Sequence, residues 1–85
     1  MGLFKTYHPV TPGEFLLWKL KEKNLTVSDF CKSSGLPKSF VLGLIRGEEN
    51  LTREVANWIA AFFKDSSETW YGIQDNLDNW EALTL

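Results

Sequence analysis

The stretch from residue 26 to residue 47, TVSDFCKSSGLPKSFVLGLIRG, constrains the fold more than any other part of the chain. Apolar residues recur at helical spacing on both sides of Gly35, which predicts two short helices joined by a tight turn. Thr26 can cap the first helix, and Asp29 stands where a carboxylate meets the free N–H groups of the first turn. Gly35 supplies the left-handed conformation that ends this helix. The pattern is typical of a helix-turn-helix, whose second helix, here about residues 38–46, would lie in a DNA major groove.

A further helix is predicted to begin after Thr11, because the sequence TPGE places a capping hydroxyl, a proline and a glutamate as in a capping box. Its inward-facing stripe is expected to comprise Leu16, Leu17 and Leu20. The preceding residues 1–10 show no clean period and are expected to form an N-terminal arm. Residues 11–85 are expected to form a single helix-turn-helix domain with a C-terminal helix for packing or dimerisation.

Two more helices are predicted after the helix-turn-helix. Thr52 can cap the first, whose apolar stripe is Val55, Ala56, Ile59, Ala60 and Phe63. Ser66 can cap the second, from residue 67 to about residue 83, whose apolar seam is Trp70, Ile73, Leu77 and Trp80. Four aromatic residues on these two helices either pack within the chain or form a dimer interface, and they are Trp58, Phe62, Trp70 and Trp80.

Charge is distributed unevenly along the chain. The net charge is −2, but residues 1–47 hold seven basic and three acidic residues, whereas residues 48–85 hold two basic and eight acidic ones. This contrast indicates different partners for the two halves, unless it is ordinary scatter of surface charge. The candidate docking face for a basic partner is formed by the acids of the last helix, Glu68, Asp75, Asp78 and Glu81.

Several classes of function lack the residues that they need. The single histidine, His8, lies far in the sequence from any serine or cysteine nucleophile, so no catalytic triad is predicted. The sequence also lacks histidines or cysteines at metal-ligand spacing and a glycine-rich phosphate-binding loop. We therefore expect that the protein is not an enzyme and that it binds no metal, cofactor or small-molecule substrate. Cys31 falls on the apolar side of its helix and is expected to be a core residue. Without 18 consecutive apolar residues the chain predicts no membrane partner and a cytoplasmic location.

The whole pattern resembles a known family. The stretches TPGEFLLWKLKEKNLTVSDFCKSSGLPKSFVLGLIRG, LTREVANWIAAFF and ETWYGIQDNLDNW, with Trp70 followed by Gln74, are similar to the HigA-type antitoxins of the Xre/Cro helix-turn-helix superfamily, over roughly residues 8–82. The resemblance implies an all-α, five-helix Xre/Cro-like (lambda-repressor-like) domain and a homodimer. It also implies binding to an operator ahead of the protein's own operon, and neutralisation of a basic RelE-like ribonuclease toxin that cleaves messenger RNA on the ribosome.

The second helix of the motif departs from the family pattern. Its outward positions are expected to include Gly43, which has no side chain for reading DNA, and Glu48 and Glu49 follow where the family commonly has Lys or Arg. Two carboxylates there would repel phosphates, so any DNA binding is expected to be weak and salt-dependent. The candidate DNA-binding residues are Lys32, Lys38, Ser39, Phe40, Leu42, Gly43 and Arg46.

Two hypotheses follow. The first is an antitoxin and transcriptional regulator that binds operator DNA and a ribonuclease toxin. The second is a helix-turn-helix scaffold that has lost DNA reading and acts as a protein-binding inhibitor or adaptor, presenting Phe40 and Leu42. Gly43 fits either hypothesis, because a glycine lets a backbone of DNA or of protein approach closely.

Overall fold

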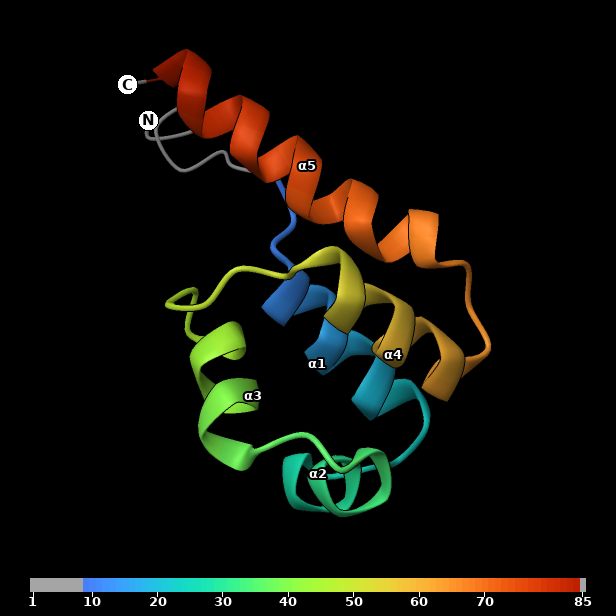
Figure 1. The fold of residues 1–85 in the computed structure, drawn as a ribbon. Coiled ribbons are helices and arrows are strands. Elements are labelled where there is room, and N and C mark those ends of the chain that lie inside the picture. Colours follow the sequence, from blue (N-terminus) through green and yellow to red (C-terminus); the bar gives the residue numbers. More distant parts are fainter. Residues whose placement is uncertain (1–8, 85) are drawn as a thin grey trace.

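The computed structural model describes residues 9–84, and all of their regular secondary structure is helical (Figure 1). The predicted all-α, five-helix fold is therefore confirmed. Most of the expected N-terminal arm, residues 1–8 with His8, lies outside the described residues. The helices are α1 (Pro12–Glu22), α2 (Val27–Ser34), α3 (Lys38–Ile45), α4 (Arg53–Phe63) and α5 (Ser67–Thr84).

The helices begin at the predicted capping residues. In α1 the Thr11 hydroxyl accepts a hydrogen bond from the Glu14 amide at 3.1 Å, and the Glu14 carboxylate accepts one from the Thr11 amide at 3.0 Å. Thr26 and Asp29 form the same reciprocal pair at the start of α2, and the Thr52 hydroxyl accepts from the third residue of α4. These contacts satisfy backbone donors that a helix leaves free at its start.

Glycines in the left-handed conformation end α2 and α3. Gly35, with φ of 81°, donates its N–H to the Cys31 carbonyl oxygen at 2.9 Å. Gly47, also with φ of 81°, donates to the Leu44 carbonyl oxygen at 3.2 Å, and the next amide donates to the Gly43 carbonyl oxygen at 2.8 Å. This pair of bonds after α3 is a Schellman motif, which turns the chain back over the helix that it has just left.

The helices are arranged around one core. Helix α5 runs along α4 and also contacts α1, whereas α3 packs against α1 and α2 (Figure 1). Pro12 and Gly13 at the start of α1 are buried, and a Cβ at Gly13 would lie 2.6 Å from the Cα of Ile45. The glycine therefore allows α1 to approach the end of α3 closely, which fixes the base of the helix-turn-helix.

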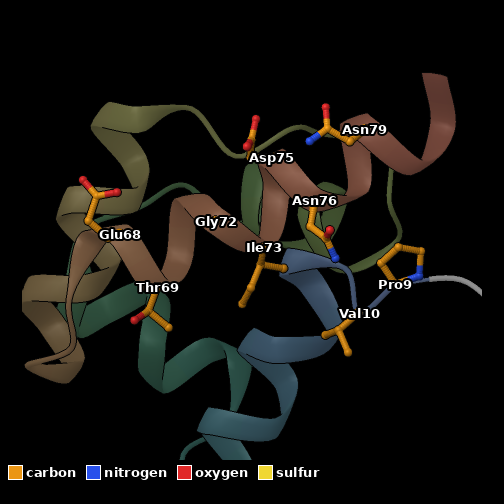
Figure 2. Close-up of a pocket in the computed structure, with 9 residues that line it drawn as sticks. All are labelled: Pro9, Val10, Glu68, Thr69, Gly72, Ile73, Asp75, Asn76 and Asn79. Carbon is orange, nitrogen blue, oxygen red and sulfur yellow. The ribbon is translucent and has the colours of Figure 1, made fainter. Parts of the chain in front are cut away.

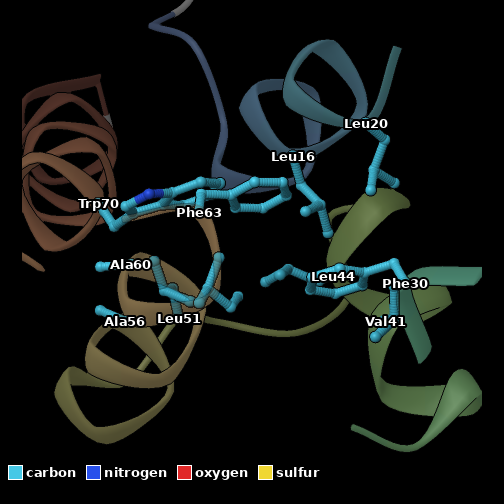
Figure 3. Packing of buried hydrophobic residues seen from close by; sticks show 11 residues of the cluster. Leu16, Leu20, Phe30, Val41, Leu44, Leu51, Ala56, Ala60, Phe63 and Trp70 are labelled. Atoms are coloured by element: carbon cyan, nitrogen blue, oxygen red, sulfur yellow. The ribbon is translucent and has the colours of Figure 1, made fainter. Parts of the chain in front are cut away.

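Aromatic rings form the centre of the core (Figure 3). The ring of Phe63 is nearly parallel to those of Phe30 and Trp70, with centroids 5.7 and 5.9 Å away. These three rings connect α2, α4 and α5, and buried aliphatic residues from α1 and α3 surround them. Because Trp70 is 0% exposed within its own chain, its assignment to a dimer interface is wrong.

One residue of α1 that was predicted to lie in the core faces solvent instead. Leu16 and Leu20 are buried as expected, but Leu17 is 44% exposed. Leu17 follows Leu16 by one residue, a rotation of about 100° around the helix axis, which carries it away from the stripe. The α5 seam is also less buried than expected after Trp70, because Ile73, Leu77 and Trp80 are only half-buried.

A carboxylate on the α4–α5 connection joins three parts of the fold. Asp65 accepts a hydrogen bond from the indole Nε1 of Trp70 at 3.0 Å and pairs with the Lys19 Nζ at 3.1 Å. Burial of this carboxyl group acts to raise its pKa, but the bonds from Lys19 and Trp70 outweigh that effect, so the pKa of Asp65 is below 3.8. The charged form is therefore the one that the folded state favours.

A buried amide connects α5 to the loop before α4. Gln74 is 3% exposed, and its Oε1 accepts a hydrogen bond from the Leu51 amide at 2.8 Å. Its Nε2 donates to Asp78 at 2.8 Å and to Asn50 at 3.5 Å. The tryptophan and glutamine that form part of the family resemblance thus have structural roles, since Trp70 fills the core and Gln74 satisfies a buried backbone donor.

Replacing Gln74 by alanine should destabilise the fold, because the buried Leu51 amide would lose its acceptor. We expect the free energy of unfolding to fall by about 1–3 kcal/mol, measured by urea denaturation. The matched control is Asn76→Ala, an amide on the exposed side of α5, which should change it by less than about 0.5 kcal/mol. Equal effects of the two substitutions would contradict this role for Gln74.

Asp65→Asn should reduce the loss of stability in acid. A pKa that is lower in the folded than in the unfolded state contributes stability that is present above the unfolded value and is lost as the pH falls through the folded one. The difference in unfolding free energy between wild type and variant should therefore be largest at neutral pH and shrink below pH 3.8. Asp29, whose pKa is also lowered, is present in both proteins and does not affect the comparison. A difference that is constant with pH would show that the Asp65 charge is not involved.

Candidate nucleic-acid interface

Helix α3 presents a polar outer side and a buried inner side. Val41 and Leu44 are buried against the core, and three of the predicted DNA-binding residues, Lys38, Ser39 and Arg46, are exposed. Phe40 and Leu42 are half-buried, and Phe40 packs against the core. Lys38, Ser39 and Arg46 are thus accessible to solvent, on α3 or directly after it.

Gly43 does not have the open surroundings that the sequence suggested. It is buried, and a Cβ built on it would lie 2.7 Å from the Cγ of Glu49. The Schellman turn after α3 brings Glu49 back, and its amide donates to the Gly43 carbonyl oxygen at 3.2 Å. The expectation that Gly43 admits the backbone of a DNA or protein partner is therefore corrected, because the chain's own Glu49 fills that space.

The charges of the segment that contains α2, α3 and the following turn balance. Between residues 26 and 49 the basic residues are Lys32, Lys38 and Arg46, and the acidic ones are Asp29, Glu48 and Glu49, all of them exposed. The hydrogen bond from the Thr26 amide, followed by that from the Thr26 hydroxyl, lowers the pKa of Asp29, so this residue is ionised at neutral pH. Because this segment has no net positive charge, it attracts phosphates only through individual cations.

The acidic residues of α5 divide into two groups. Glu68 and Asp75 line an open groove between α5 and the start of the described chain, together with Pro9, Val10 and Ile73 (Figure 2). Glu68 also pairs with Arg53 at 3.3 Å, an exposed ion pair of little energetic weight. Further along the helix, Asp78 is an acceptor for the Gln74 amide, and Glu81 is exposed. These acids follow the helix around rather than forming one flat face.

The remaining aromatic candidates differ in exposure. Trp58 is 53% exposed, and its indole Nε1 donates to the Ser34 carbonyl oxygen at 2.8 Å, which holds the ring at the end of α2. Phe62 is half-buried; together with Trp58 and Ser34 it lines a surface hollow, and its ring contacts that of Phe30 edge-on. Sequence reasoning missed Trp18, which is 56% exposed on α1, next to Leu17, which is 44% exposed.

Residues 9–84 contain neither a metal-binding cluster nor a membrane-spanning helix. No cluster of three or more His, Cys, Asp or Glu side chains in this part of the chain could bind a metal ion. None of the five helices there combines the length and the apolar character that crossing a membrane requires.

Comparison with known proteins identifies relatives of the same fold. No protein-family model matches the chain. The HTH-type transcriptional regulator YbaQ of Escherichia coli K12 is 30% identical over 78 residues, which cover 91% of this chain and 69% of YbaQ. An addiction module antidote protein of the HigA family from Coxiella burnetii is 28% identical, with a TM-score of 0.84 over 92% of this chain and 86% of that one.

The chain belongs to the HigA-type helix-turn-helix regulators. Antitoxin HigA of Pseudomonas aeruginosa, whose structure contains the higBA promoter, has the same fold with a TM-score of 0.83. That protein is 19% identical, and the match covers 91% of this chain and 85% of the Pseudomonas chain. At this identity the similarity concerns the fold only.

Proposed function

We propose that this HigA-type regulator binds operator DNA as a homodimer through α2 and α3, in the cytoplasm, and neutralises a basic RelE-like ribonuclease toxin. The observation that carries the DNA-binding part is the exposure of Lys38, Ser39 and Arg46 on the outer side of α3. The same fold in Pseudomonas HigA, in a structure that contains promoter DNA, supports this part. In this proposal the protein acts by binding and not by catalysis.

The exposed side chains suggest a division of roles on DNA. Arg46 can donate two hydrogen bonds to guanine, and Lys38 and Lys32 can contact phosphates or base edges. Ser39 can contact either kind of base pair, and Phe40 or Leu42 can contact a thymine methyl group. Because residues 26–49 carry no net positive charge, a second copy on a neighbouring half-site would supply much of the affinity.

Two sets of aromatic residues remain candidates for the dimer interface: Trp58 with Phe62 on α4, and Trp80 on α5. For the toxin, we propose that Glu68, Asp75, Asp78 and Glu81 attract its basic surface. Charge complementarity of this kind raises the association rate and the specificity for the partner more than it raises the final affinity. The acidic helix does not belong to the α2–α3 unit, so the two activities use different surfaces.

Replacing both Lys38 and Arg46 by alanine should weaken binding to the DNA upstream of the gene by about 10-fold or more and flatten its salt dependence. Mobility shift across a salt series measures this, and two chains per retarded palindrome would support the dimer. The control, Lys21→Ala with Lys64→Gly, removes the same charge from outside α2 and α3. If the wild type shows no sequence preference even at low salt, the protein-binding scaffold that presents Phe40 and Leu42 becomes the better proposal.

Asp75→Asn combined with Glu81→Gln should slow association with a purified RelE-like toxin several-fold at low salt, with a smaller effect at high salt. Stopped-flow or surface plasmon resonance measures the rate. Glu54→Gln with Glu22→Gln, two exposed carboxylates outside α5, provides the control. An unchanged association rate for the α5 variant would place the toxin-binding surface elsewhere.

A further inference from the structure

Gly43 occupies a position of α3 that should face outward. It lies four residues after Ser39 and three before Arg46, both of them exposed, so the three positions share one side of the helix. Yet Gly43 is buried, whereas the residues on either side of it along this stripe are not. The side chain that covers it belongs to Glu49, six residues further along the chain.

The turn after α3 holds Glu49 in this place through the backbone. The amides of Glu48 and Glu49 both donate to the Gly43 carbonyl oxygen, at 2.8 and 3.2 Å. The Cδ and Oε2 atoms of Glu49 each lie 3.7 Å from the point where a Cβ of residue 43 would be. The Glu49 Cγ therefore lies where a side chain of residue 43 would begin, and the carboxylate of Glu49 lies next to this point of α3.

A carboxylate at this point has a definite preference among base pairs. An ionised carboxylate only accepts hydrogen bonds. In the major groove guanine presents acceptors only and thymine an acceptor and a methyl group, while adenine places an acceptor beside its amino donor. Cytosine presents its N4 amino donor with no acceptor of its own beside it, and it is the base that Glu and Asp side chains contact.

We propose that Glu49 is a specificity-determining residue that accepts a hydrogen bond from the amino group of a cytosine in each operator half-site. The inference rests on the proposed DNA binding. It gives the Glu49 carboxylate a role besides the repulsion of phosphates. The acceptor atoms of guanine and thymine repel the carboxylate, which disfavours operators with these bases at the same position. This role of Glu49 also gives a reason for a glycine in the last turn of α3, since glycine inside a helix is less favourable than alanine.

Selection of binding sites from a randomised DNA library tests the proposal, with wild type, Glu49→Gln, Gly43→Ala and the control Glu48→Gln. Wild type should prefer cytosine about 10-fold or more at one position of each half-site. Glu49→Gln should shift that position toward adenine, whose N6 and N7 match an amide. Gly43→Ala should weaken the preference at the same position only, because its Cβ would meet the Glu49 Cγ at 2.7 Å. Glu48→Gln should leave it unchanged.

The outcomes separate the inference from the proposed function. If Glu49→Gln is folded by circular dichroism and selects the same bases as wild type at every position, Glu49 does not read DNA, while the DNA-binding proposal stands. A shift caused equally by Glu48→Gln would also overturn the assignment. If wild type selects no sequence, both the inference and the proposed regulator function are wrong.

Discussion

The burial of Trp70 is the constraint on which the other contacts depend. Its ring stacks on Phe63, its indole nitrogen bonds to Asp65, and Asp65 in turn holds Lys19 of α1. One turn later on the same helix, Gln74 accepts a hydrogen bond from the Leu51 amide and so fixes the end of the loop that follows α3. A helix that lies outside the helix-turn-helix therefore positions both α1 and the segment that carries Glu48 and Glu49.

What the sequence could predict was local. The capping threonines and the left-handed glycine at residue 35 act within a few residues, so the helix boundaries could be predicted from neighbouring residues alone. Contacts between distant segments could not. Whether Trp70 faces its own core or a second chain depends on the placement of Phe63 and Asp65, and the cover over Gly43 depends on the direction in which the chain turns after α3.

The same distinction applies to the candidate site. Helical spacing and the motif were enough to select Lys38, Ser39 and Arg46 as outward residues, and the structure places them on the surface. The charge of Glu48 and Glu49 is visible in the sequence, but charge alone predicted only that they would repel DNA phosphates. Backbone hydrogen bonds to the Gly43 carbonyl oxygen hold both residues at the end of α3, and the contact of the Glu49 side chain with Gly43 gives that carboxylate a defined position.

The shared space of residues 43 and 49 has an evolutionary consequence. Any side chain at residue 43 must compete with Glu49 for one volume, so the two positions are energetically coupled and their substitutions are not additive. A descendant that acquires a longer residue in the helix must first lose or redirect the glutamate, and the order of the two changes matters. Divergence at this face is therefore expected to proceed by paired substitutions, with one path through an intermediate that carries alanine or glycine at both positions.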